Sequence, residues 1–190
     1  MQRRSASVML ALAIALAGCA GHPGSQPEAA ARPASDNIWS SRMEAQKQAM
    51  EEAAEGTGVL VSQTPDNQLK LEIPGDLSFD PNRSSLRVEF RPILDKFARS
   101  LVENPHAWVT IIGHTDKTGN DALDEPLSVN RAARTRDYLV SKGAASNRFT
   151  IEGHGSREPL AAKDRDGKQA RNGRVEIYVA ERQATAMLQR

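Results

Sequence analysis

The chain has 190 residues, a formal net charge of +1, and aromatic residues at only 4% of its positions. This length allows one domain of ordinary size plus appendages. The near-neutral charge gives no strong electrostatic attraction to nucleic acid or to an anionic membrane surface. The scarcity of aromatic side chains leaves few platforms on which bases could stack. The single cysteine excludes a disulfide within the chain.

The N-terminal segment has the pattern of a processing signal. Arg3 and Arg4 precede a short apolar run, residues 8–17, which is too short to span a bilayer as a helix. The run ends in Leu16-Ala17-Gly18-Cys19, which resembles a bacterial lipoprotein signal. The resemblance implies a signal peptide over residues 1–18, lipid chains including palmitate on Cys19, and, from Ala20 in place of Asp, the outer membrane. An ordinary secretory signal with an incidental cysteine is the alternative.

Residues 19–56 are predicted to be a lipidated flexible tether. Positions 20–35 are rich in Ala, Pro, Gly and Ser and cannot bury a core. Positions 38–55 have helix-forming composition but only a thin apolar stripe, so this part either forms a short helix or stays loose.

The globular part is predicted to span residues 57–182, followed by a tail at 183–190. Helical spacing begins near Ser84 or Ser85, either of which can cap a helix, and Pro92 indicates a kink or a later start. Gly143 is the predicted stop of the second helix. The patterns predict strands at 59–61, 69–73, 107–112, 148–152 and 174–179, and helices at 86–102 and 127–140. The fold class is therefore α/β (an α+β sandwich): a single mixed sheet with helices packed against it, in the order hairpin-α-β-α-β-β.

One loop concentrates the chemistry of the chain. Gly113-His114-Thr115-Asp116-Lys117-Thr118-Gly119 places a carboxylate in a Gly-flanked loop, and Arg131 lies early in the following helical pattern. A fixed anion and a fixed cation on adjoining elements can hold a zwitterion. This pattern favours a binding module for an amino-acid-like group over a catalyst. Asp116 as a plain turn residue, and Arg131 as a solvated residue or as the partner of Asp116, are the alternatives.

An ordered set of motifs extends from this loop over roughly residues 57–182. Together they resemble the OmpA-like C-terminal domain, the peptidoglycan-associated module, and the whole chain resembles a peptidoglycan-associated outer-membrane lipoprotein. The set consists of Phe79-Asp80, Gly113-His114-Thr115-Asp116, Thr118-Gly119, Leu127-Ser128 with Arg131-Ala132, Tyr138-Leu139, Gly143, Arg148, Gly153-His154-Gly155 with Pro159, and Asn172 with Arg174-Val175-Glu176.

The resemblance implies non-covalent binding of peptidoglycan at the diaminopimelate of its stem peptide, with no cofactor and no catalysis. Asp116 would accept from the ligand ammonium and Arg131 would contact the ligand carboxylate. Thr118 would position the loop or the ligand, or serve a simple turn. Ser128 is expected to cap a helix rather than touch the ligand. Arg174 is expected near the site, with an ordinary strand charge as the alternative.

Two departures from the family pattern bear on affinity. Asp124 stands where the family usually has Asn, and Gly173 where it usually has Arg; Lys168-Gln169-Ala170 also replaces a common Gly-Arg-Ala. If Asp124 lines the pocket, it adds negative charge near the ligand carboxylate, while Gly173 removes a positive charge. Both changes predict weaker binding or altered specificity, and Asp124→Asn and Gly173→Arg are predicted to strengthen it.

Three other functions were weighed against wall binding. A metal-dependent hydrolase could use His114, Asp116 and His154, although their spacing is not that of HExxH. An envelope scaffold lipoprotein could use the same fold for protein partners, contacted through the tether or through residues 38–55, with weak wall binding. A stator-type domain coupled to an ion channel is disfavoured because the sequence shows no membrane-spanning helix.

Overall fold

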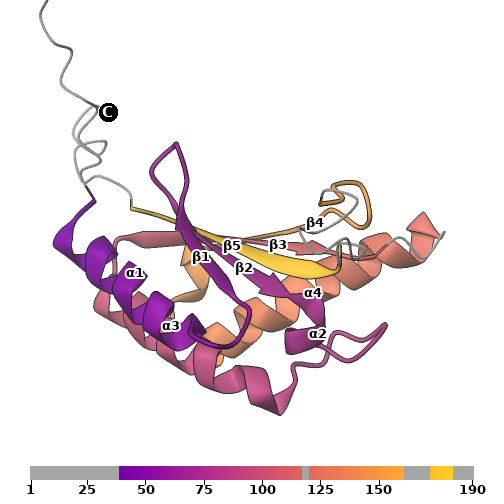
Figure 1. The fold of residues 1–190 in the computed structure, drawn as a ribbon, viewed down its shortest axis with the longest axis horizontal. Helices are drawn as coiled ribbons and strands as arrows, with labels where there is room; N and C mark the ends of the chain where they lie inside the picture. The colour runs from indigo at the N-terminus through magenta and orange to yellow at the C-terminus, as the bar shows by residue number, and fades with distance from the viewer. Residues whose placement is uncertain (1–38, 117–119, 161–171, 182–190) are drawn as a thin grey trace, which may run out of the picture. The chain divides into compact units, whose positions relative to one another are not determined.

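The computed structural model describes residues 39–116, 120–160 and 172–181 (Figure 1). Cys19 with most of the predicted tether, Thr118, and the predicted tail lie outside the described residues. Within the described part, none of the helices has the length and hydropathy of a membrane span. The helices are α1 (Ser41–Ala54), α2 (Gly75–Ser78), α3 (Arg91–Glu103) and α4 (Asp121–Ser141), with 3-10 turns η1 (Val88–Phe90) and η2 (Ser146–Arg148), and the strands are β1 (Leu60–Gln63), β2 (Leu69–Pro74), β3 (Ala107–His114), β4 (Phe149–Gly153) and β5 (Arg174–Glu181).

The five strands form one mixed sheet in the order β1-β2-β5-β3-β4. β3 and β4 are parallel, and the other neighbours are antiparallel. Figure 1 shows α1, α3 and α4 on the same face of this sheet. The predicted fold class and element order are confirmed. Side chains alternate along a strand, so one set from each central strand meets the helices; this buried set is Leu69, Leu71, Ile73, Ala107, Val109, Ile111, Val175, Ile177 and Val179.

Helix α1 belongs to the folded domain. Ser40 caps it, its hydroxyl accepting from the backbone N–H of Met43 at 3.1 Å. Met43 and Met50, two turns apart, are 1% and 0% exposed within the core. The folded part therefore includes residues 41–54, which the sequence pattern places in the tether as a possible short helix. Met43 and Met50, together with the buried Gln46, dock the helix against α3.

Helix α3 begins later than the apolar spacing predicts. Pro92 occupies its first turn, where a missing backbone N–H costs no helical hydrogen bond. The turn η1 precedes it, and Ser84 and Ser85 cap neither element. The later start, one of the two outcomes predicted for Pro92, is the one observed.

Two glycines let α4 lie directly on the sheet. Gly113 of β3 and Gly153 of β4 are register partners. A Cβ at Gly113 would lie 2.0 Å from the carbonyl oxygen of Ser128, and one at Gly153 would lie 2.3 Å from Val129 Cγ2. The sequence predicts that Ser128 caps a helix, and this prediction is wrong. Ser128 lies within α4, where its hydroxyl accepts from the N–H of Gly155 at 3.0 Å. These contacts fix α4 against the end of β3.

The C-terminal end of α4 agrees with the sequence. The helix ends at Ser141, and Gly143 follows with a φ of 103°. This left-handed conformation strains any residue with a Cβ, so glycine is the natural stop.

Candidate functional site

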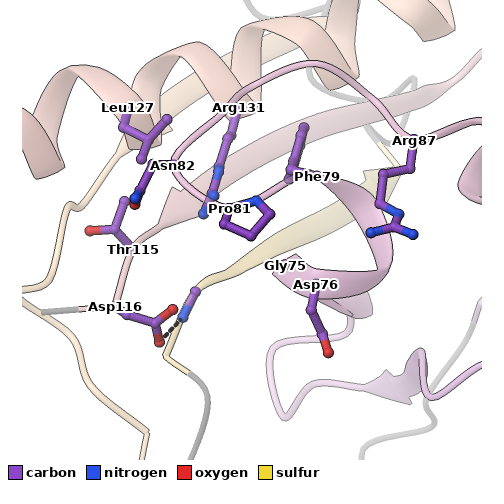
Figure 2. A pocket seen from close by; sticks show the side chains of 11 residues that line it. Gly75, Asp76, Phe79, Pro81, Asn82, Arg87, Thr115, Asp116, Leu127 and Arg131 are labelled. Atoms are coloured by element: carbon purple, nitrogen blue, oxygen red, sulfur yellow. Dashed lines mark hydrogen bonds between the residues drawn. The ribbon is translucent and has the colours of Figure 1, made fainter. Parts of the chain in front are cut away.

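A pocket of about 250 Å³ lies where the end of β3, the start of β5, α4 and the segment from α2 to η1 meet (Figure 2). Asp116 enters it from the loop after β3, and Arg131 from α4. The loop that contains Phe79 borders the pocket beside Arg131. The two charged residues predicted from the sequence therefore share one cleft.

The carboxylate of Asp116 is fixed by backbone groups of the chain that leads into β5. Its Oδ1 accepts from the N–H of Asn172 at 2.8 Å and from that of Gly173 at 2.9 Å. Its Oδ2 lies 2.8 Å from the position that a Cβ on Gly173 would occupy. One oxygen thus anchors the carboxylate, and the other borders the space left by the missing side chain.

The guanidinium of Arg131 is held in a buried position. The residue is 7% exposed, its Nε donates to the carbonyl of Arg83 at 3.0 Å, and its Cζ lies 5.1 Å from the centre of the Phe79 ring. Burial lowers the pKa of Arg131, and the charge of Asp116 opposes that shift. Its Nη1 lies 3.6 Å from the same empty Cβ position at Gly173. A cation and an anion therefore border one space, each immobilised by other groups.

Of the other predicted site residues, the two that the structure describes do not line this pocket. Thr118 is outside the described residues. Asp124 is 1% exposed on α4, and Arg174 is 5% exposed on β5; neither lines the pocket. Because side chains alternate along a strand, Gly173 faces the pocket and Arg174 the opposite side of the sheet. There its Nε donates to Glu176 Oε1 at 2.7 Å.

Several pocket residues were not predicted as site residues. Phe79, Asp76 and Arg87 come from the segment between β2 and α3, and Thr115 precedes Asp116. Thr115 is 2% exposed, and its hydroxyl has no hydrogen-bond partner within the described part of the chain. The Phe79-Asp80 motif was the only sequence signal that could have indicated these residues. The contact of Phe79 with Arg131 is visible only in the folded structure.

Behind the pocket, on the sheet face away from the helices, lies a network of titratable side chains. His114 is 1% exposed; burial, and then the charge of Arg174, lower its pKa to about 4. Burial would raise the pKa of Glu176, but hydrogen bonds from Tyr178 and Arg174, together with the nearby positive charges, lower it to about 2. The hydrolase alternative grouped His114, Asp116 and His154, but the acid that lies with the two histidines is Glu158, not Asp116.

Comparison with known proteins agrees with this architecture. A sequence profile of the OmpA family matches residues 78–173, about half of the chain. The chain is 37% identical over 103 residues to the peptidoglycan-associated lipoprotein of Rhizobium meliloti, covering 53% of this chain and 58% of that protein. It is 39% identical over 105 residues to the peptidoglycan-binding protein ArfA of Mycobacterium bovis, covering 55% and 32%. The alignments thus span less than two thirds of these relatives' own lengths.

Among solved structures, the cell wall anchor of the T6SS from Pseudomonas aeruginosa superposes with a TM-score of 0.61 at 30% identity. The match covers 72% of this chain and 97% of that one. The sequence match and the shared fold lead to one conclusion: this chain belongs to the OmpA family.

Proposed function

We propose that the domain binds peptidoglycan non-covalently through the diaminopimelate of the stem peptide. With lipid on Cys19 in the outer membrane, it would tether that membrane to the cell wall from the periplasmic side. The observation that carries the proposal is the pair of immobilised opposite charges, Asp116 and Arg131, on one small pocket. The names of the relatives, a peptidoglycan-associated lipoprotein and a peptidoglycan-binding protein, support the same ligand.

The pocket suits a group with an ammonium and a carboxylate side by side. Oδ2 of Asp116 would accept from the ammonium, and the Nη atoms of Arg131 would donate to the carboxylate. Each unlike pair at about 4 Å attracts by roughly 4 kcal/mol at an effective dielectric near 20, before desolvation is subtracted. Two such pairs give a gross attraction of about 8 kcal/mol, from which the costs of desolvation and association are subtracted, so both pairs are needed for measurable binding.

The arrangement of the pocket favours binding because the two charges are already in place. Oδ1 of Asp116 and Nε of Arg131 are held by backbone groups, so little side-chain freedom is lost when a ligand arrives. The volume of about 250 Å³ is at the small end for ligand sites and fits an amino-acid group better than a run of sugars. The hydroxyl of Thr115 is available for a third contact, and Thr118 keeps its proposed role in positioning the loop.

The test is cosedimentation with purified peptidoglycan. The full chain is compared with Asp116→Ala, Arg131→Ala and a control, Arg136→Ala, which removes a half-buried charge of the same helix that pairs with Asp137 away from the pocket. Both pocket variants are expected to remain in the supernatant while the control sediments like the unmodified protein. Circular dichroism checks that each variant folds. Equal sedimentation of all four proteins would remove the proposed site.

A second comparison tests the ligand. Stem peptides that carry meso-diaminopimelate or lysine at the third position differ by one carboxylate. The lysine peptide leaves Arg131 partly buried and unpaired, so its affinity is expected to be at least about tenfold lower. Equal affinity for the two peptides would contradict the role of Arg131.

A further inference from the structure

Three side chains with metal-ligand chemistry meet on the sheet face away from the helices. His114 ends β3, and His154 and Glu158 lie in the turn that follows β4. Each offers one ligand atom, and these atoms all lie within 4.8 Å of one another. The pairing of His114 with Arg174 across β3 and β5 sets this cluster on the opposite side of the sheet from Gly173 and the pocket.

His114 is the unexplained member of the cluster. It is 1% exposed, and neither of its ring nitrogens has a hydrogen-bond partner among the described residues. Glu176 Oε1 lies 4.0 Å from its Nε2, too far for a hydrogen bond. The ring of His154 stands nearly perpendicular to it, with the centroids 5.4 Å apart. A buried imidazole without hydrogen-bond partners is destabilising, unless a metal ion accepts the lone pair of one ring nitrogen.

His154 has the surroundings of a metal-bound imidazole. Its Nδ1 lies 3.0 Å from Glu158 Oε2, so these two proposed ligand atoms are already neighbours. Its Nε2 lies 3.0 Å from Glu152 Oε2 in a hydrogen bond. A histidine that ligates a metal through one nitrogen commonly donates from the other to a carboxylate, which fixes the ring. Glu152 is placed for that second contact.

We propose that His114, His154 and Glu158 form a binding site for a divalent transition metal, with Zn²⁺ as the best fit. Two imidazoles and one carboxylate are a known ligand set for Zn²⁺, with the fourth position open to water. The three ligand atoms lie within 4.8 Å of one another, and Glu158 is exposed, so its carboxylate can adjust to the ion.

The local charges suit a cation. Glu158 and Glu152 bring two negative charges to the cluster. Arg174 lies in the neighbouring network, where its guanidinium is paired with Glu176 at 2.7 Å. A bound metal would join the end of β3 to the turn after β4.

The test is calorimetric titration of ZnCl₂ into the untagged full chain, purified in detergent, stripped with EDTA and dialysed. One equivalent is expected to bind, and Glu158→Gln and His154→Asn are each expected to weaken binding at least tenfold. The chain has four histidines, so a His22→Asn/His106→Asn variant keeps only the proposed pair and is expected to bind like the unmodified protein. Because His114 is buried and its replacement endangers the fold, Glu158→Gln at the exposed edge carries the test.

A second measurement does not depend on the heat of binding. Zn²⁺ is expected to raise the thermal midpoint of the unmodified chain and of the His22→Asn/His106→Asn variant, but not that of Glu158→Gln. Co²⁺ in place of Zn²⁺ is expected to give the absorption bands of a tetrahedral ion. Absence of binding, equal binding by Glu158→Gln and His154→Asn, or loss of binding in the His22→Asn/His106→Asn control would each overturn the proposal.

Discussion

Replacement of Asp116 by Asn isolates the charge at the pocket from its structural role. Oδ1 of Asp116 accepts from two backbone N–H groups, those of Asn172 and Gly173. An amide oxygen can accept the same two hydrogen bonds, so the loop keeps its anchor. The second oxygen, which borders the pocket, becomes an NH₂ group that cannot accept from a ligand ammonium.

The expected loss follows from the position of Asp116. A hydrogen bond to a charged group contributes about 1.5–3 kcal/mol. Asp116 is exposed, whereas Arg131 is 7% exposed, so solvent screens the carboxylate and the lower half of that range applies. A loss of about 1.5–2 kcal/mol corresponds to a Kd for the stem peptide roughly 10- to 30-fold higher.

The assay is calorimetric titration of a stem peptide that contains diaminopimelate into the full chain. Asp137→Asn is the matched control, because it removes the same charge from an exposed position on α4 that pairs with Arg136. The thermal midpoints of both variants should match that of the unmodified protein. A Kd for Asp116→Asn within twofold of the unmodified value would refute the role of the carboxylate.

Three further changes test other parts of the structure. Gly173→Ala is expected to raise the Kd for the stem peptide several-fold, because the added Cβ displaces Asp116 Oδ2. If a guanidinium at this position adds to the binding of the ligand carboxylate, Gly173→Arg should bind more tightly than Gly173→Ala. Equal Kd values for the two variants would contradict that gain. Gly113→Ala is expected to destabilise the fold by about 3 kcal/mol, measured by urea unfolding, because its Cβ meets the Ser128 carbonyl; an unchanged midpoint would show that α4 can shift. In EDTA, the free energy of unfolding is expected to fall by up to about 3 kcal/mol as the pH drops from 6.5 towards 4. The cause is that His114 is protonated at a higher pH in the unfolded chain than in the folded chain. An NMR titration that gives the His114 imidazole a pKa near 6.5 in the folded protein would contradict this.

The sheet and its two long helices were predictable because their signals are local. Alternation in β2 and β5 and helical spacing in α3 depend on neighbouring residues only. Helix α1 was not assigned to the domain because its core contribution rests on Met43 and Met50, and between them lies the polar Gln46. That glutamine is 2% exposed and donates to the hydroxyl of Ser100 on α3 at 3.1 Å. A polar residue buried by a tertiary hydrogen bond carries no apolar signal in the sequence.

The site was only partly predictable. Asp116 and Arg131 stand out because a charge in a Gly-flanked loop and a charge on the next helix are separated by a short stretch of chain. The wall formed by Phe79 lies 52 residues before Arg131, so nothing local links them. Arg174 was expected near the pocket from its place in the motif, but the alternation of β5 directs it to the other face, while its neighbour Gly173 faces the ligand space.

The proposed metal site and the pocket lie on opposite faces of the sheet but beside the same ends of β3 and β5, so a short chain of contacts connects them. Nη1 of Arg174 donates to the carbonyls of Glu158 and Asn172, at 3.2 and 3.1 Å. The N–H of Asn172 in turn donates to Asp116. A metal that fixes Glu158 would therefore steady the backbone that holds the pocket carboxylate. By linkage, Zn²⁺ should then tighten stem-peptide binding in the unmodified chain and not in Glu158→Gln, whereas equal peptide affinity with and without Zn²⁺ would show that the two faces act independently.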